Sequence, residues 1–338
     1  MKKLERPTLE DVALAANVST ATISRSINEP DKVAKSTLDR IQTVIRELGY
    51  TPNFGGRMLA SNRSNTIGAI IPTMANAMFA SGLQAFQEEL AKSSVTLLVA
   101  SSGYSGEQEL QQIRSLMTHG ADALLLIGAS RPKESTELLE LRNIPYVISW
   151  CYKTDPARVF VGFDNVKAAQ AMTEHTLALG HQRIAMIAGV SKDNDRARQR
   201  IQGVKRAVNQ SNNASLISVI ESPYSLEAGG AAFEQLMLMD ESPTVIICGN
   251  DVLAAGAIVR AKQLGIRIPA QVSITGFDDI NLATAVFPAL TTVRVPHTDM
   301  GRTAARLLLD LLSGESTVKS VKLETEIITR DSLSPPPK

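Results

Sequence analysis

The chain has 338 residues, of which 44% are hydrophobic, and its 35 Lys and Arg against 34 Asp and Glu give a net charge of +1. At roughly 150 residues per domain, this length predicts two or three folding units with enough apolar material for real cores. The composition excludes an intrinsically disordered chain, and the near-neutral charge excludes a positive field over the whole molecule.

Residues 1–63 differ from the rest in charge. They hold ten Lys and Arg and seven Asp and Glu, a net charge of +3, which leaves −2 for the remainder. One face of residues 8–17 is apolar at helical spacing through Leu9, Val12, Ala13 and Ala16. The interruption at Asn17 and Val18 predicts a short turn before the next helix.

A second and a third helix follow this turn. Ser19 is a typical N-cap for a helix that buries Ile23 and Ile27 and leaves Thr20, Ala21, Thr22, Ser24 and Arg25 outside. The third helix is expected from about Ser36 to Leu48, with Gly49 after its end. Its expected inward residues are Leu38, Ile41, Val44, Ile45 and Leu48. Three helices with a short turn between the first two are the helix-turn-helix plan, in which the second helix enters the DNA major groove.

From Thr66 onward, short apolar runs alternate with amphipathic stretches. The runs expected to be strands are residues 67–71, 95–99, 123–127 and 146–149, then 183–187, 216–220, 245–248 and 272–275. This alternation predicts βαβ units with parallel sheets buried on both faces, in two doubly wound lobes. We expect the chain to cross between the lobes near 162, 292 and 322, and ligands to bind at the carboxyl ends of the strands.

Polar and aromatic residues follow several of these strands. They include residues 72–79, Trp150, 163–165, 222–224, 250–251 and 278–279. Such groups at a cleft rim suit a hydroxyl-rich ligand, which needs hydrogen-bond partners and flat rings to pack on. Asn and Asp after a strand are also common helix N-caps, so each position alone is weak evidence.

Other chemistries lack their signatures. The sequence has no dinucleotide-binding glycine motif, P-loop, nucleophile elbow or zinc-protease motif, and its four His are scattered. We therefore expect no catalytic residues, no metal and no cofactor. Cys151 and Cys248 exclude a disulfide framework and favour a reducing setting. No signal-like or membrane-length apolar run occurs, so we expect no membrane partner and a cytoplasmic protein.

Three segments of the basic head resemble the lactose-repressor/galactose-repressor (LacI/GalR) family of transcription regulators: Thr8–Ala13, Asn17–Asn28 and Leu48–Asn53. By this resemblance, Thr20, Ala21 and Arg25 read base edges. It also implies that Thr8, Ser19, Thr22, Ser24, Asn28, Tyr50 and Asn53 anchor to phosphates. Ala34 departs from the serine that usually caps helix three in this family, and Ser36 is the expected substitute, which shortens the helix.

Residues 53–61 resemble the family's hinge helix, which docks as a symmetric pair in the minor groove. Leu59 matches the leucine that wedges between base pairs and kinks the duplex. Gly55 and Gly56 replace a more alanine-rich pattern, at a cost of about 1 kcal/mol per glycine in a helix. We therefore expect this hinge to fold only on DNA.

The body resembles the family's effector domain through Val161–Asn165, Leu179–Ile184, Arg200–Gly203, Gly249–Asp251, Val272–Asp279 and Pro288–Val293. Arg200, Asn250 and Asp278 align with a polar effector-binding set, while Asn76, Phe79, Trp150 and Tyr224 fall at specificity-setting positions. For Trp150, packing at a strand end remains an alternative to covering a sugar.

The resemblance implies an all-α helix-turn-helix head and an α/β periplasmic-binding-protein-like body of two doubly wound parallel-sheet lobes. The expected boundaries are a head over 1–52, a hinge and linker over 53–63, an effector and dimerisation domain over 64–332, and a disordered tail over 333–338. The first lobe is expected over about 64–162 and 292–321, and the second over about 163–291 and 322–332.

The implied function is sequence-specific regulation of transcription, most simply repression of carbohydrate metabolism genes. The expected partners are a pseudo-palindromic operator, a second copy of the chain in a homodimer, and a small sugar or sugar acid between the lobes. Two other classes stay open at this point. A periplasmic-type binding protein would carry no DNA-binding head, and a sugar-processing enzyme would turn its ligand over.

Overall fold

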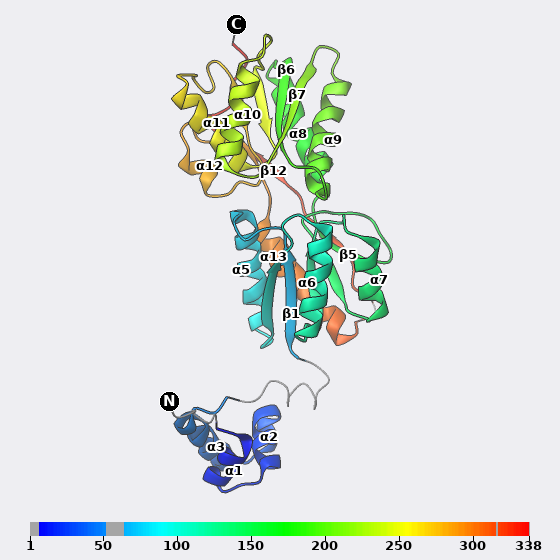
Figure 1. Cartoon of the computed structure of the whole chain (residues 1–338), viewed down its shortest axis with the longest axis vertical. Coiled ribbons are helices and arrows are strands. Elements are labelled where there is room, and N and C mark those ends of the chain that lie inside the picture. Colours follow the sequence, from blue (N-terminus) through cyan, green and yellow to red (C-terminus); the bar gives the residue numbers. More distant parts are fainter. Residues whose placement is uncertain (1–6, 52–63, 316, 338) are drawn as a thin grey trace. The chain divides into compact units, whose positions relative to one another are not determined.

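The computed structural model describes residues 7–51, 64–315 and 317–337. The chain divides into two units, Met1–Ser64 and Asn65–Lys338. The first unit is helical over its described residues, and the second is an α/β body (Figure 1). None of the helices in the described ranges is both long and apolar enough to cross a membrane.

The head contains α1 (Leu9–Ala16), α2 (Thr20–Asn28), a 3₁₀ turn (Pro30–Lys32) and α3 (Lys35–Leu48). Thr8 starts α1 with a capping box, because its hydroxyl accepts from Asp11 N while Asp11 accepts from Thr8 N. Ser19 caps α2 as predicted, since Thr22 N donates to its hydroxyl at 3.2 Å. The buried core of the head consists of Val12, Ala13, Ala16, Ile23, Ile41 and Tyr50.

Two details of the predicted third helix are wrong. The helix begins at Lys35, so Ala34 rather than Ser36 is its N-cap residue, and no side chain caps it. Leu48 was expected inward but is 39% exposed. Leu48 lies at the end of α3, after the last turn that faces the core. Gly49 then takes a left-handed φ of 63°, and Tyr50 fills the core instead.

The first lobe of the body is built on a six-stranded sheet in the order β11-β5-β4-β3-β1-β2, in which every pair is parallel. Its strands are β1 (Thr66–Ile71), β2 (Thr96–Ser101), β3 (Ala123–Ile127), β4 (Tyr146–Ser149), β5 (Val159–Gly162) and β11 (Val321–Lys322). Alternate residues of β1 and β3 enter different cores, as the two-residue period of a strand requires.

Helices cover both faces of this sheet (Figure 1). One core packs β1 and β3 against α5 (Ala77–Ala91) and α13 (His297–Ser313), and the other packs them against α6 (Gly106–Thr118) and α7 (Lys133–Leu141). Helices α5 and α13 cross closely at Gly82 and Gly301. A Cβ at Gly301 would overlap the carbonyl of Gly82, so the crossing requires glycine.

The second lobe holds a four-stranded parallel sheet in the order β7-β6-β8-β9. Its strands are β6 (Arg183–Gly189), β7 (Ser215–Ser222), β8 (Val245–Cys248) and β9 (Ser273–Thr275). Its helices are α8 (Asn165–Ala178), α9 (Asp195–Gln210), α10 (Leu226–Met237), α11 (Asp251–Gln263) and the short α12 (Leu282–Ala285). Helices α8 and α9 pack together, as do α10 and α11, on opposite faces of the sheet. The predicted helix-turn-helix head and two doubly wound lobes are thus confirmed.

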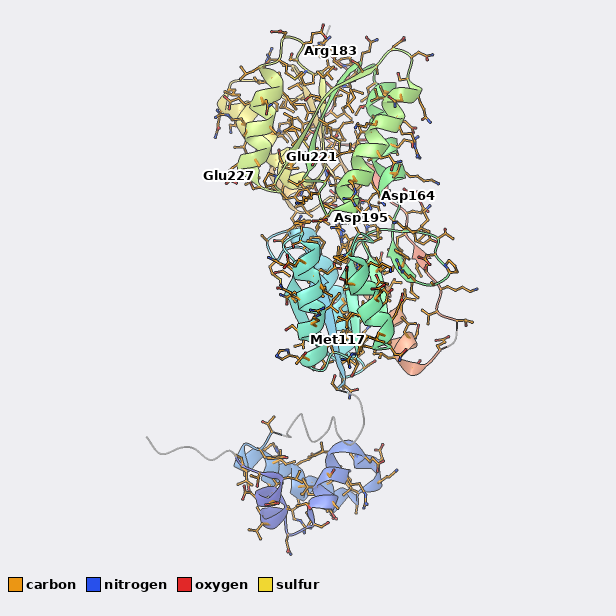
Figure 2. All side chains as sticks on the ribbon, turned by 45° about the vertical axis from the view of Figure 1, so that its right-hand side comes forward. Met117, Asp164, Arg183, Asp195, Glu221 and Glu227 are labelled. Atoms are coloured by element: carbon orange, nitrogen blue, oxygen red, sulfur yellow. The ribbon has the colours of Figure 1, made fainter. Side chains whose placement is uncertain are left out.

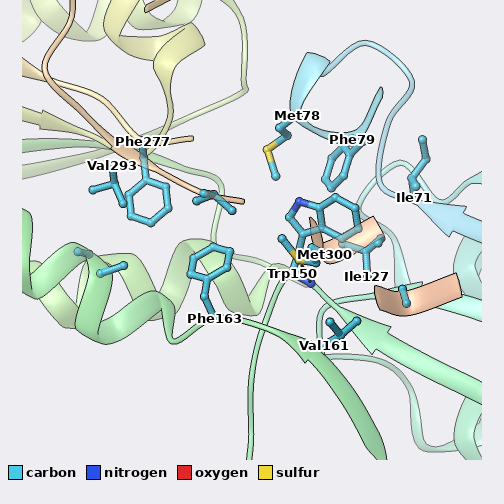
Figure 3. Packing of buried hydrophobic residues seen from close by; sticks show 14 of the residues in the cluster. Ile71, Met78, Phe79, Ile127, Trp150, Val161, Phe163, Phe277, Val293 and Met300 are labelled. Carbon is cyan, nitrogen blue, oxygen red and sulfur yellow. Dashed lines mark hydrogen bonds between the residues drawn. The ribbon is translucent and has the colours of Figure 1, made fainter. Parts of the chain in front are cut away.

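Apolar packing continues where the chain passes between the lobes. Trp150, Phe163, Phe277 and Val293 belong to one buried cluster that draws on both lobes (Figure 3). Phe163 and Phe277 stack with ring centroids 6.0 Å apart. Val293 lies in β10 (Thr292–Arg294), which forms an antiparallel pair with β12 (Glu326–Ile328). The sequence pattern did not predict this pair.

Residues 332–334 run beside β9, the edge strand of the second lobe. Ile274 N donates to Ser332 O at 2.9 Å, and Ser334 N donates to Ser273 Oγ at 3.2 Å. The buried ring of His181 contacts Ser334 O through Nε2 at 2.8 Å. The prediction of a disordered tail from 333 is therefore wrong for its first two residues, because Leu333 is buried and Ser334 contacts Ser273 and His181.

Candidate functional site

The first half of α2 carries the outward face of the head. Thr20, Ala21 and Arg25 are exposed, whereas Ile23 is fully buried. Ala21 and Arg25 lie one turn apart and therefore share a face. Arg25 forms no ion pair within the described residues, so its guanidinium is available to a ligand. Thr22 and Ser24 are half-buried at the edge of this face.

The predicted phosphate anchors lie in different settings. Thr8 and Ser19 stand at the N-termini of α1 and α2, where helix N–H groups and the helix dipole favour an anion. Tyr50 is 8% exposed, and its ring belongs to the head core. Asn28 is the last residue of α2. Asn53 and Leu59 lie outside the described residues.

In the body, the predicted effector residues come together. Asn76, Phe79, Arg200, Tyr224 and Asn250 line one internal cavity of about 10 Å³, which is room for about one water molecule. They come from four different strand-to-helix connections or helix starts in both lobes. The convergence follows from topology, because the carboxyl ends of the parallel strands in each sheet meet at one edge.

Arg200 is held on every side. Its Nε donates to Asn165 Oδ1 at 2.9 Å, its Nη1 donates to the Gly249 carbonyl, and its Nη2 lies 3.5 Å from Asp278 Oδ1. The guanidinium carbon sits 3.8 Å from the centre of the Phe277 ring. With 3% of its surface exposed, Arg200 is a fixed part of the cavity wall.

Asp278 lies behind Arg200 and does not line the cavity. Its burial raises its pKa to about 6, and the nearby guanidiniums of Arg200 and Arg196 hold that rise in check. Its backbone has a left-handed φ of 110°, which is uncommon for a residue with a side chain. Asp278 thus anchors Arg200 from behind.

Trp150 also stands behind the wall. It is fully buried, with Phe79 packed edge-on at 5.5 Å between ring centroids and His297 stacked at 6.2 Å (Figure 3). Its Nε1 donates to His297 Nδ1 at 3.2 Å. Burial lowers the pKa of His297 to about 4, and the positive charge of Arg200 adds to this effect. In this structure Trp150 supports Phe79 from behind.

Four lining residues were missed by sequence reasoning: Met78, Tyr104, Asn194 and Arg196. Tyr104 follows β2 and Asn194 precedes α9, so the rule of polar or aromatic residues at strand ends could have found both. Arg196 lies one helical turn before Arg200, and that spacing was a usable signal.

A second, wider cavity of about 450 Å³ lies next to the first. It is lined by Gly103, Tyr104, Ser105, Val190, Lys192, Asp193, Asn194, Pro223 and Tyr224. The rings of Tyr104 and Tyr224 approach to 5.9 Å across the two lobes, and both rings also line the inner cavity. Burial raises the pKa of Tyr104, which therefore stays a neutral hydroxyl. The tyrosine pair separates the two chambers.

The lobes also touch outside these cavities. Ala129 N donates to Asp195 Oδ2 at 2.8 Å, and Arg198 Nη2 donates to Ser130 Oγ at 3.0 Å. Figure 2 labels Asp195 at the start of α9, beside the first lobe. Gly128, at a φ of 75°, is required here because a Cβ would overlap the Arg196 guanidinium. Over the described residues, no group of three or more acidic, His or Cys side chains could hold a metal ion.

Comparison with known proteins gives matches over both units. Residues 8–53 match the model for bacterial regulatory proteins of the lacI family, and residues 173–333 match a periplasmic binding protein-like domain. The HTH-type transcriptional repressor CytR of Escherichia coli K12 is 33% identical over 96% of both chains. The HTH-type transcriptional regulator GntR of Pseudomonas aeruginosa is 32% identical over 97% of this chain and 96% of its own.

Solved structures agree with this pattern. A LacI-family regulator from Silicibacter pomeroyi has a TM-score of 0.88 at 25% identity and covers 97% of this chain and 99% of its own. The lac repressor dimer bound to operator has a TM-score of 0.85 at 25% identity, with the same coverage. A CelR–cellobiose complex has a TM-score of 0.71 at 28% identity and covers 97% of this chain and all of its own.

Proposed function

The chain belongs to the lacI family of bacterial regulatory proteins, and from this premise we propose how its two units share one task. It is a DNA-binding transcriptional regulator and not an enzyme. Its head binds a pseudo-palindromic operator as part of a homodimer, and its body binds a small sugar or sugar acid that changes operator affinity. The protein acts in the bacterial cytoplasm and associates with the nucleoid when it is bound to DNA.

The head assignment draws its support from the outward face of α2. An exposed arginine without an ion-pair partner in the described residues can grip guanine with two hydrogen bonds, and Ala21 can pack on a thymine methyl. Thr8 and Ser19 place helix N-termini for phosphate contacts. We assign Thr22, Ser24, Asn28, Tyr50 and Asn53 to the phosphate contacts, and Leu59 to the wedge. The related lac repressor structure is a dimer on its operator.

One observation carries the effector assignment: five side chains from both lobes line a single narrow cavity. A sugar needs more room than the one water molecule that this cavity accommodates, so the lobes must move apart to admit it, and its binding energy then depends on how far they close. We propose that this closure acts on the paired hinges and lowers operator affinity, so that the effector is an inducer. The related CelR structure contains cellobiose, which supports a carbohydrate as ligand.

A gel-shift titration of the full-length protein tests this function. The probe is DNA from upstream of its own gene, with and without a panel of sugars, over a range of salt. We expect one palindromic site to persist at high salt and one sugar to weaken its binding by roughly 5–150-fold, which corresponds to a coupling of 1–3 kcal/mol.

Two variants separate the roles of the units in that titration. Arg25→Ala should cost about 1–3 kcal/mol on the specific site and relax base discrimination, while keeping effector binding. Asp278→Asn should keep operator binding and lose the sugar response, because Arg200 loses its buried counter-charge. Absence of any specific site at every salt concentration, or turnover of a sugar by the protein, would overturn the proposal.

A further inference from the structure

The wall of the inner cavity is rich in hydrogen-bond donors and positive charge. Among its nine lining residues are two guanidiniums, Arg196 and Arg200, and no carboxylate. Both arginines project from α9, one turn apart, and both are more than nine-tenths buried. The remaining residues supply amide, phenol and apolar surface.

Three helix N-termini converge on the same cavity. Asn76, Asn194 and Asn250 cap α5, α9 and α11, and all three line the cavity. Each uses its Oδ1 to accept a backbone N–H of its own helix, at 3.3, 3.4 and 2.9 Å. The NH₂ group of Asn194 donates to Val190 O and Tyr224 Oη, so those of Asn76 and Asn250 are the ones left for a ligand. The positive ends of three helix dipoles favour a negative ligand.

One of these NH₂ groups has no hydrogen-bond partner within the described residues. Asn250 is 1% exposed, and its Nδ2 is buried without a hydrogen bond. A buried donor without an acceptor costs roughly 1–3 kcal/mol, and such groups in native proteins have a reason. An acceptor atom supplied by a ligand in this cavity removes that cost.

The two arginines differ in how many of their hydrogen-bond donors are used by protein groups. Arg200 uses Nε, Nη1 and Nη2 on protein groups, and Asp278 offsets its charge. Arg196 uses only Nη1 within the described residues, toward Asp195 at 3.0 Å. Both oxygens of Asp195 are already engaged, one by Arg196 and the other by Ala129 N. Asp195 thus offsets the charge of Arg196 as Asp278 offsets that of Arg200, but Arg196 lines the cavity while no protein group in the described residues uses its Nε and Nη2 donors.

We propose that the effector is a sugar acid, whose carboxylate is bound by Arg196 together with the Nδ2 of Asn250, and that Arg196 is the residue that selects this acid over the neutral sugar. The inference rests on the proposed function and names the chemistry of its effector. A carboxylate has one charge and acceptor sites for a guanidinium and an amide together. A phosphate dianion would need the donors of the second guanidinium as well, and those of Arg200 are already used by protein groups.

Calorimetry on the full-length protein tests the proposal with three matched classes of probe. These are six-carbon aldonic and uronic acids, the hexoses with the same hydroxyl configuration, and the corresponding hexose 6-phosphates. We expect one acid to bind at least about tenfold more tightly than its hexose, because charge-assisted hydrogen bonds are the stronger ones. Arg196→Gln should abolish that preference, because it should weaken binding of the acid at least about tenfold more than binding of the hexose.

Arg198→Gln is the matched control. Arg198 is an exposed arginine on the same helix that donates to Ser130 and Ser191 and does not line the cavity. Its loss should leave the ratio of acid to hexose affinity unchanged. Arg196→Lys, which keeps the charge but not the planar fork, should retain part of the preference. Circular dichroism and operator binding of each variant establish that it is folded.

The outcomes distinguish a failure of the sugar-acid assignment from a failure of the proposed regulatory function. Equal binding of acid and hexose, tightest binding of a phosphate, no binding of any acid, or an Arg196→Gln variant that keeps the preference would each overturn the sugar-acid assignment. If a hexose then still releases the operator, the proposed function stands without the inference. Absence of a specific operator removes the proposed function itself, whatever the calorimetry shows.

Discussion

Two buried carboxyl groups stand close together behind the cavity. Asp251 accepts from Thr292 Oγ1 through one oxygen and from Ile280 N at 2.8 Å through the other. Burial, with the nearby charge of Asp278 as a second cause, raises the pKa of Asp251 to about 8. Burial also raises the pKa of Asp278 to about 6. These residues bind protons more tightly in the folded chain than in the unfolded one.

The raised pKa of Asp251 makes the stability of the body depend on pH with a defined sign. Between the unfolded pKa of 3.8 and the folded value of about 8, the folded state holds more protons. Stability from this group is therefore complete at low pH and is lost as pH rises toward 8. His297 acts in the opposite sense, because its folded pKa of about 4 makes stability rise up to its unfolded value of 6.5.

Above pH 6.5 Asp251 contributes most of this pH dependence, because Asp278 is then largely ionised. There we expect the free energy of unfolding of the body to fall as pH rises to 8, and Asp251→Asn to flatten that slope. Urea titrations of the full-length protein at half-unit pH steps measure both. Asp193→Asn, a change at an exposed position, should leave the slope as it is. An Asp251→Asn protein with the parental slope would refute the assignment.

Strand ends made part of the cavity predictable at the residue level. Asn76, Tyr224 and Asn250 were identified because polar residues follow apolar runs, and the structure places them on one wall. Their contact with an effector stays a prediction. Tyr104 and Arg196 were missed although the strand end after β2 and the helical spacing before Arg200 were usable signals for them. Trp150 could not be placed because a sequence does not distinguish the surface of a cavity from the layer behind it.

At the level of elements, caps decide where the helices of the head begin. Thr8 and Ser19 hold the first turns of α1 and α2 with side-chain hydrogen bonds. Helix α3 lacks this support, because Ala34 has no oxygen in its side chain. The backbone of Ala34, at φ −56° and ψ 134°, already has the extended conformation of an N-cap.

Ala34→Ser should therefore stabilise α3. A serine oxygen there can accept from the N–H of Ser36 or Thr37, a gain of roughly 0.5–2 kcal/mol. Amide hydrogen exchange in the full-length protein should show slower exchange along α3, by about fivefold for each ~1 kcal/mol. Ala34→Val places no acceptor at the same position and should give no protection. Unchanged or faster exchange in Ala34→Ser would contradict the prediction.

Most of the predicted strands are apolar runs that follow a helix. Eight apolar runs led to eight strands near their expected positions, because a buried parallel strand is a continuous apolar segment. Strand β5 has four residues, β10 and β12 have three each, and β11 has two. Strands β4, β8 and β9 are about as short, but each lies in an apolar run after a helix, whereas β10 meets β12 from more than thirty residues away in the sequence. Their pairing is set by the lobes that they connect.

For the whole molecule, the separation of DNA contact from ligand contact has a thermodynamic consequence. If an effector weakens operator binding by some factor, the operator must weaken effector binding by the same factor. Trp150, the single tryptophan of the chain, lies directly behind the cavity wall and provides a fluorescence signal for ligand binding. The charge is divided in the same way, with +3 in residues 1–63 and −2 in the remainder.

Tryptophan fluorescence should thus give an effector Kd that increases on addition of saturating operator duplex. The increase should equal the ratio of operator Kd values with and without effector, within roughly 5–150-fold. A duplex of scrambled sequence, at a concentration too low for nonspecific binding, should leave the effector Kd unchanged. Unequal ratios would show that the two sites are not linked through one equilibrium between two forms of the body.

The packing of residues 332–334 beside β9 bears on how the protein is made. The head is complete once about fifty residues have left the ribosome, and domains fold as units in order of synthesis. Neither lobe is complete at that stage or for long afterwards. The first lobe awaits α13 and β11, and the second awaits the segment that contacts Ser273 and His181. An interrupted synthesis therefore releases a folded head joined to an unfinished body, whose open sheets make it a substrate for chaperones and proteases.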